Sequence, residues 1–133
     1  MAELFADFVT PYHLDDRDVA PLNMEGHRDT SYELKLPSDA DASQGHRAIL
    51  AFTLHATDPD DLHLQVSVGW RGHMHTVWDY TINSNVLHTV HQLIPAEILK
   101  AGTDNFANVH LASGDGHVRV ENVVLWYHRT GQK

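Results

Sequence analysis

Apolar and polar residues alternate along most of this chain, and this period of two predicts β-strands. The clearest stretch is LHLQVSVGW, in which Leu62, Leu64, Val66 and Val68 share one face. Comparable runs predict further strands at 31–36, 47–56, 77–82, 86–94, 105–112 and 117–128. Clusters of turn-forming residues separate these strands, among them TDPDD at 57–61 and SGDG at 113–116.

The last of these predicted strands changes phase along its length. Val118 and Val120 fall on one face. Val123 and Leu125 fall on the opposite parity, so a regular strand would turn them to the other side of the sheet. One extra residue near Glu121–Asn122 would return all four to the same face. The pattern therefore predicts a β-bulge at this point.

The stretch IPAEILKAG interrupts the alternation. Pro95 suits the first position of a helix, where its missing N–H costs nothing. Glu97 early and Lys100 late match the helix dipole, and Gly102 suits a left-handed C-terminal cap. The sequence therefore predicts one short helical turn near residues 95–101 that closes one end of the core.

Taken together, the strands predict an all-β fold, an antiparallel jelly-roll sandwich of about eight strands, because turn signals recur at roughly 8–12 residues. The length suits a single domain over residues 1–133. Residues 1–30 are acidic and weakly patterned, so we expect an irregular N-terminal segment. Within it FADFVTPY predicts an edge strand, since Phe5, Phe8 and Val9 need burial.

The net charge of −9 argues against polyanionic binding partners. Binding to nucleic acid or to an anionic membrane needs clustered Lys and Arg, so neither partner is expected. The chain has no cysteine, which excludes disulfides, zinc–thiolate sites and thiol nucleophiles. No secretory signal or membrane-spanning stretch is visible, which favours a cytoplasmic protein, although a removed signal would leave the same sequence.

The second half of the chain, about residues 60–130, resembles the galactose-binding-domain-like jelly rolls of discoidin domains and carbohydrate-binding modules. The residues on which the resemblance rests are Ile94, Pro95, Leu99, Lys100, Gly102, Asn105, Gly114 and Gly116, followed by VVLWYH. In place of the usual V-x-V-Asn-Gly hairpin the chain has VSVGWRG, with Gly69 and Trp70 at the Asn-Gly positions. The resemblance implies a sandwich that binds ligand at one end, and in some members a structural Ca²⁺.

The segment GWRGHMHTVWDY gathers residues of the kind that bind sugars. Aromatic faces stack on sugar rings, and charged or amide side chains hold the hydroxyls. We expect Trp70 to lie in an exposed loop as the stacking platform, with Arg71, His73 and Asp79 as further contacts. The other two tryptophans are expected to pack in the core.

Two kinds of metal site are also suggested by the sequence. His73 and His75 share one face of an extended strand, which makes them a candidate divalent-metal pair with Asp79 as a third ligand. The stretches 57–61 and 102–105 offer the oxygen ligands that Ca²⁺ prefers, although Asp and Asn also form turns unaided.

These observations favour a non-catalytic protein that binds carbohydrate or another small polar ligand. A second interpretation is a small metal-dependent β-sandwich enzyme that uses His73 and His75. A third is a structural or assembly subunit that forms homo-oligomers through an exposed sheet face or edge strand. No serine-nucleophile motif or phosphate-binding glycine loop is present in the sequence.

Overall fold

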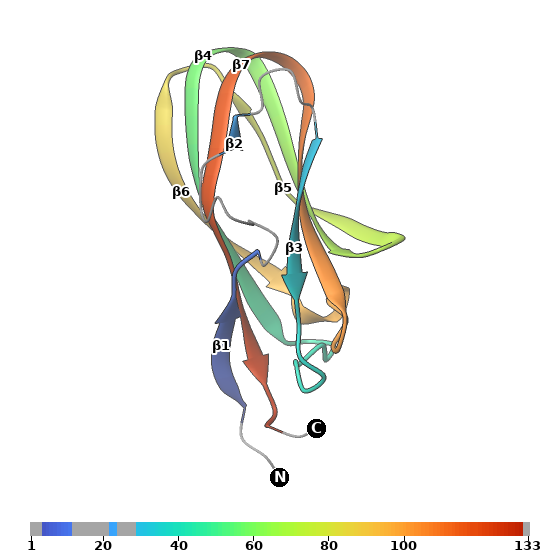
Figure 1. Ribbon diagram of the computed structural model, residues 1–133. Coiled ribbons are helices and arrows are strands. Elements are labelled where there is room, and N and C mark those ends of the chain that lie inside the picture. The colour runs from blue at the N-terminus through green and yellow to red at the C-terminus, as the bar shows by residue number, and fades with distance from the viewer. Residues whose placement is uncertain (1–3, 12–21, 24–28, 132–133) are drawn as a thin grey trace.

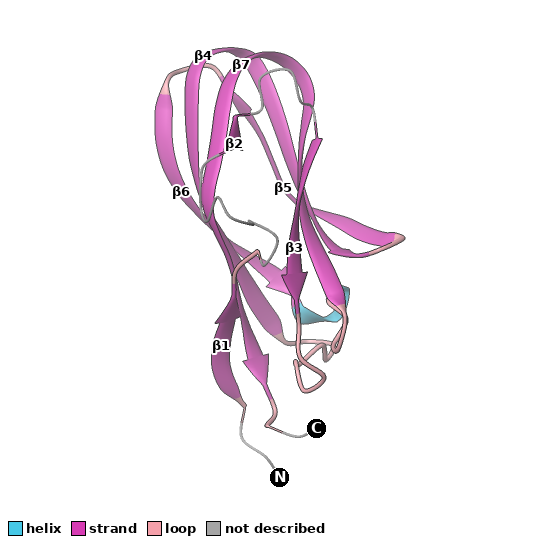
Figure 2. Ribbon diagram, in the orientation of Figure 1, coloured by secondary structure: helices cyan, strands magenta, loops and turns pink. Residues whose placement is uncertain are grey.

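A computed structural model of the chain describes residues 4–11, 22–23 and 29–131. Strands dominate these residues, and the single helical element is one short 3-10 turn (Figure 2). No helix in this part of the chain is long and apolar enough to cross a membrane. The elements are, in chain order, β1 (Phe5–Val9), β2 (Leu22–Asn23), β3 (Asp29–Lys35), β4 (Arg47–Trp70), β5 (His73–Ile82), β6 (Val86–Pro95), η2 (Ala96–Ile98) and β7 (Asp104–Arg129).

The two long strands β4 and β7 organise the fold, because each bends over one end of the molecule and runs through both layers (Figure 1). They pair with each other from Ile49↔Trp126 to Gly69↔Phe106. The second part of β4 pairs with β5, and the first part of β7 pairs with β3. These strands form what we call the β5 layer. The other layer, which we call the β6 layer, has two pairs of neighbours. The first part of β4 pairs with β6, and the second part of β7 pairs with β1 and β2.

The order in which the chain visits the two layers is that of a jelly roll. It passes from β1 in the β6 layer to β3 in the β5 layer, and then through both layers within β4. After β5 and β6 it passes through both layers again within β7, and every pairing of the seven strands is antiparallel. With β4 and β7 each counted twice, and the two-residue β2 set aside, these are the eight strands of the predicted all-β sandwich.

Two segments that the sequence predicted as turns, 57–61 and 113–116, are corners inside β4 and β7. The backbone ladder shifts register there instead of ending. A Cβ added at Gly114 would lie 2.0 Å from the Asp61 carbonyl oxygen, so the two corners touch through backbone that only glycine allows. The Asn83 side chain accepts the Asp61 N–H at 2.7 Å and fastens the β5–β6 turn to the corner.

The core lies between the two layers and is filled by the alternate residues of each strand, as the period of two predicted. The four alternating residues of LHLQVSVGW are all buried. The largest fully buried side chains are Leu34, Leu36, Leu50, Leu54, Leu62, Leu64, Ile94, Leu125, Val66, Val68 and Val118.

The predicted bulge and the predicted helical turn are both present. The register between β4 and β7 shifts between Ala51 and Thr53, and Asn122 on the facing strand has a φ of 57°. The extra residue brings both halves of this segment to the core face. After Pro95 the turn η2 covers one end of the core with the buried side chains of Ile98 and Leu99.

The predicted N-terminal edge strand is confirmed as β1, but the prediction that its phenylalanines are buried was wrong. Phe5 is 46% exposed and Phe8 is 53% exposed, and Phe8 packs instead against Trp126 on the outer surface, with ring centroids 5.0 Å apart. The two-residue strand β2 was not predicted. Most of the expected irregular segment, at 12–21 and 24–28, lies outside the described residues.

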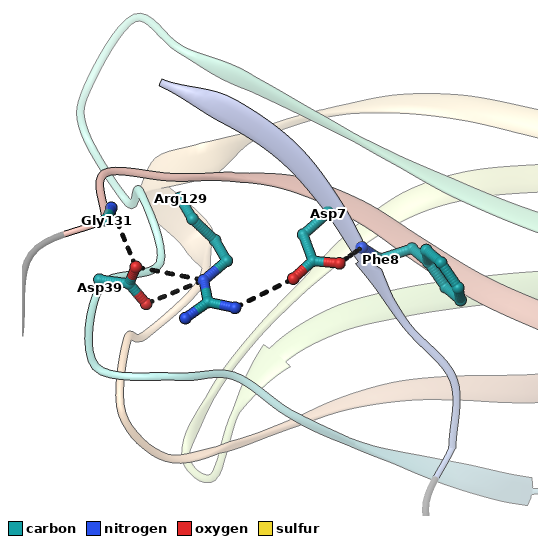
Figure 3. Close-up of polar contacts among 5 residues, drawn as sticks. All are labelled: Asp7, Phe8, Asp39, Arg129 and Gly131. Atoms are coloured by element: carbon teal, nitrogen blue, oxygen red, sulfur yellow. Dashed lines mark hydrogen bonds and ion pairs between the residues drawn. The ribbon is translucent and has the colours of Figure 1, made fainter. Parts of the chain in front are cut away.

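β1 is fastened to the end of β7 by a group of ionic contacts that we call the Arg129 clasp, made of Asp7, Asp39 and Arg129 (Figure 3). Arg129 Nε donates to both carboxylate oxygens of Asp39, at 3.0 and 3.1 Å. Arg129 Nη1 donates to Asp7 at 3.1 Å. Asp39 also accepts the Gly131 N–H at 3.0 Å. Three separate segments of the chain meet in this clasp.

Candidate functional site

The β4–β5 hairpin projects from the side of the sandwich (Figure 1). Trp70 pairs with His73, so Arg71 and Gly72 form a two-residue turn, and Gly72 has a φ of 84° that suits glycine. A Cβ added at Gly69 would lie 2.1 Å from the His73 carbonyl oxygen. The departure from the usual Asn-Gly hairpin therefore gives a tight hairpin in which Gly69 permits the close approach of β5.

The Trp70 indole at the end of β4 is half-buried and has two neighbours. The His73 ring stacks on it, with centroids 3.6 Å apart and planes inclined by 24°. Lys100 Nζ lies 4.3 Å from the Trp70 ring centroid, in a cation–π contact. Trp70 was expected to be an exposed stacking platform. A ligand that stacks on this ring has to move one of the two neighbours or approach the remaining part of the indole.

Lys100 reaches the hairpin from the loop between η2 and β7, and a buried amide fixes that loop. The Asn105 side chain, which is 0% exposed, accepts the Lys100 N–H and donates to the Lys100 carbonyl, both at 2.9 Å. It also donates to the Thr103 carbonyl at 3.3 Å. Gly102, with a φ of 75°, forms the bend of the loop. These contacts give a physical reason for the Lys-x-Gly-x-x-Asn pattern seen in the sequence.

A cavity of about 290 Å³ opens between this loop and the hairpin. It is lined by Trp70, Arg71, Lys100, Thr103, Asp104 and Phe106. A second, more open cavity of about 490 Å³ shares Arg71 and Phe106 with the first. We call the two together the hairpin cleft. The cleft combines two aromatic rings with charged and hydroxyl groups, which is the composition of small-ligand sites.

The predicted contact residue Asp79 lies away from this cleft. It pairs with Gln65, well back from the turn where His73 pairs with Trp70, and on the outer face of the β5 layer. Its carboxylate accepts hydrogen bonds from Gln65 Nε2 at 3.0 Å and from His63 Nε2 at 2.5 Å. These bonds, the Gln65 bond first, hold the pKa of Asp79 below its ordinary value of 3.8. The structure brings Trp70 together with its two nearest predicted partners and leaves Asp79 apart.

The candidate metal ligands do not gather into a larger group. His73 and His75 share one face of β5, whereas Asp79 lies on the other face beyond an irregularity in the ladder. Among the described residues no three or more His, Asp or Glu side chains are arranged to hold a metal ion, and this includes 57–61 and 102–105. A divalent metal at the histidine pair, or Ca²⁺ in either loop, stays a prediction.

The remaining tryptophans differ from each other. Trp78 is half-buried and packs edge-on against Phe52 of the core, with ring centroids 5.6 Å apart, as expected. Trp126 was expected in the core but is 44% exposed on the outer face of the β6 layer. It stands there in a row of exposed apolar side chains on four paired strands, Phe8, Trp126, Ile49 and Leu93. This row is the feature that bears on the assembly interpretation, which stays a prediction.

No protein-family model and no curated protein matches the chain. Several solved structures are similar to it. PorU from Porphyromonas gingivalis, in its dimeric latent form, has a TM-score of 0.67 and 8% identity, over 97% of this chain and 13% of PorU. The K1 cleaved adhesin domain of Lys-gingipain from the same bacterium has a TM-score of 0.51 and 17% identity, over 89% of this chain and 71% of that domain.

A viral capsid structure is also similar. The T13 viral particle of IBDV has a TM-score of 0.50 and 12% identity, over 97% of this chain and 36% of that chain. All three identities are low, so the likeness shows a shared fold alone. That fold is an all-β sandwich, as expected from the resemblance to the galactose-binding-domain-like family. Membership of that family stays a prediction.

Proposed function

We propose that this protein is a non-catalytic binding module that holds a carbohydrate in the hairpin cleft. The observation that supports this most is the composition of the cavity of about 290 Å³, where the rings of Trp70 and Phe106 meet Arg71, Lys100 and Asp104. Its volume is close to the lower end of the range for small-ligand pockets, roughly 300–1,000 Å³. A ligand of one or two sugar units suits such a site.

A sugar suits this cleft for chemical reasons. One face of a sugar ring exposes C–H groups, and an aromatic ring such as Phe106 or Trp70 contacts that face favourably. The hydroxyls at its rim need donors and acceptors. Arg71 and Lys100 supply donors, and Asp104 supplies an acceptor. No step in this proposal requires a nucleophile or a proton transfer.

The adhesin-domain neighbour adds to the proposal by analogy. A domain named for adhesion has the same sandwich, which is compatible with a binding role toward a carbohydrate or a protein. Because one fold supports many functions, this analogy has little weight beside the residues of the cleft.

The test is a glycan-binding screen of the purified chain, followed by calorimetry on each hit with two variants. Trp70→Ala removes one aromatic wall of the cleft, and Trp126→Ala removes an exposed tryptophan of the other layer. We expect Trp70→Ala to abolish binding and Trp126→Ala to leave it unchanged. Phe106→Ala repeats the test without touching the hairpin turn. Equal loss from both tryptophan variants, or no hit at all, would argue against the proposal.

A further inference from the structure

Arg71 is the first of two cations that line the hairpin cleft. It is exposed at the turn of the hairpin and lines both cavities. Within the described part of the chain its guanidinium donates no hydrogen bond and forms no ion pair. Five N–H donors in a fork that matches a carboxylate therefore face solvent beside the cleft.

Lys100 is the second. Among the described residues its ammonium forms no ion pair and no hydrogen bond, and lies over the Trp70 ring. A cation–π contact uses the charge of the ammonium and leaves N–H donors open. Asn105 fixes the backbone of the loop, so this charge is held at the cavity, and no carboxylate of the described residues pairs with it.

The sign of the charge in the cleft is opposite to that of the whole chain. The sequence has 9 Lys and Arg against 18 Asp and Glu. The cavity beside Trp70 has two cations, Arg71 and Lys100, against one carboxylate, Asp104. In the adjoining cavity Arg71 is the only charged residue of the lining. An acidic protein thus has a cationic cleft, and an anionic ligand would meet an attractive potential there.

We propose that the ligand of the hairpin cleft is an acidic saccharide whose carboxylate binds between Arg71 and Lys100. This inference rests on the proposed carbohydrate-binding function and adds the chemical class of the sugar, a uronic acid. Guanidinium–carboxylate contacts are bidentate and stronger than neutral hydrogen bonds, so Arg71 fixes the orientation of the sugar. The aromatic rings of the cleft then contact its ring face.

The experiment compares a galacturonic acid disaccharide with its fully methyl-esterified form, which has the same rings and linkage but no charge. Binding is measured by titration calorimetry at two salt concentrations. We expect the acid to bind at least about tenfold more tightly than the ester, since a hydrogen bond to a charged group is of this strength. The difference should shrink at high salt.

Three variants test which residues cause the preference for the acid over the ester. Arg71→Gln and Lys100→Met should each bring the affinity for the acid towards that for the ester. Arg47→Gln removes the same charge from an exposed position at the start of β4 and should have little effect. Met at position 100 keeps the aliphatic stem against Trp70, so the cleft retains its shape.

The outcomes separate this inference from the function on which it rests. If acid and ester bind equally, or if Arg47→Gln weakens binding as much as Arg71→Gln, the inference is overturned and carbohydrate binding stands. If a sulfated disaccharide without a carboxylate binds more tightly than the acid with the same dependence on Arg71, the carboxylate assignment is overturned. If no saccharide, charged or neutral, binds the wild-type chain, both proposals fail.

Discussion

The Arg129 clasp and the hairpin cleft use the same kind of side chain in opposite ways. Arg129 donates to Asp39 and Asp7 and lies over the ring of Phe5, 5.6 Å from its centroid. These contacts join β7 to two other segments, β1, which holds Phe5 and Asp7, and the loop that holds Asp39. Arg71, at the hairpin turn, forms no ion pair within the described residues.

The difference indicates what each region is for. In the clasp the cation is matched by two carboxylates, one of them only 5% exposed, so its binding capacity is used inside the fold (Figure 3). In the cleft the cations are held by the backbone of a tight turn and of a fixed loop, and within the described residues neither Arg71 nor Lys100 forms an ion pair. We infer that the clasp stabilises the fold, and recognition is proposed only for the cleft. Substitutions should therefore have separable effects in the two regions.

Asp39→Ala should have the largest effect on stability. The buried carboxylate accepts from Arg129 Nε and from the Gly131 N–H, and its loss leaves both donors without their acceptor. We expect the free energy of unfolding to fall by about 2–3 kcal/mol, measured by urea denaturation. The exposed Asp60→Ala, at a residue whose φ is not positive, is the control. A loss of less than about 0.5 kcal/mol, as at ordinary surface sites, would mean that the clasp is not structural.

Gly69→Ala should have a smaller effect on stability and a large one on the cleft. The new methyl group would meet the His73 carbonyl, so the hairpin has to open. We expect overpacking to cost about 1–2 kcal/mol, because the hairpin tip can move aside. The ring-current shift of the His73 protons, which the stacked Trp70 produces, should disappear from the NMR spectrum.

The matched control in the hairpin is Gly72→Ala. A Cβ there meets nothing within 4 Å, and only the positive φ opposes it. The His73 shift should persist in this variant, and signals from the clasp should be unchanged in both. An unaltered His73 shift in Gly69→Ala would show that the close approach in the hairpin is not required for the stacking.

The comparison also shows which features the sequence could predict. The bulge at Asn122 and the turn after Pro95 depend on residues adjacent in the chain, and local pattern predicted both. The corner at 57–61 has the composition of a turn, and it remains in the ladder because Gly114 of β7 touches it. That contact joins residues far apart in sequence, which local pattern does not describe.

The residues of the candidate site also differ in whether local sequence could group them. Trp70, Arg71 and His73 lie around one hairpin turn, so sequence proximity was enough to group them. Asp79 lies apart from them, because its position along β5 and its face depend on the register with β4. Phe106 was missed because pairing with Gly69 is what brings β7 to the cleft.

Lys100 was also missed as a site residue, although a signal for it existed. The Lys-x-Gly-x-x-Asn pattern was recognised in the sequence as a structural feature of the loop. The buried Asn105 that completes the pattern is the residue that holds Lys100 beside Trp70. The pattern could therefore have predicted that the loop holds the Lys100 cation beside the aromatic hairpin.

The smallest expected effect that distinguishes the two regions is on the free energy of unfolding at low pH. The hydrogen bond from the Phe8 N–H, followed by that from Arg129, holds the pKa of Asp7 below its ordinary value of 3.8. A depressed pKa in the folded state adds stability above pH 3.8, and this stability is lost as the pH falls through the folded value.

Asp7→Asn should therefore flatten the acid limb of a stability–pH curve below about pH 4. The effect should be modest, because the side chain is one-third exposed. Arg71 has no carboxylate partner in the described part of the chain, so Arg71→Gln should leave that limb unchanged. An equal flattening in both variants would contradict the distinction between clasp and cleft.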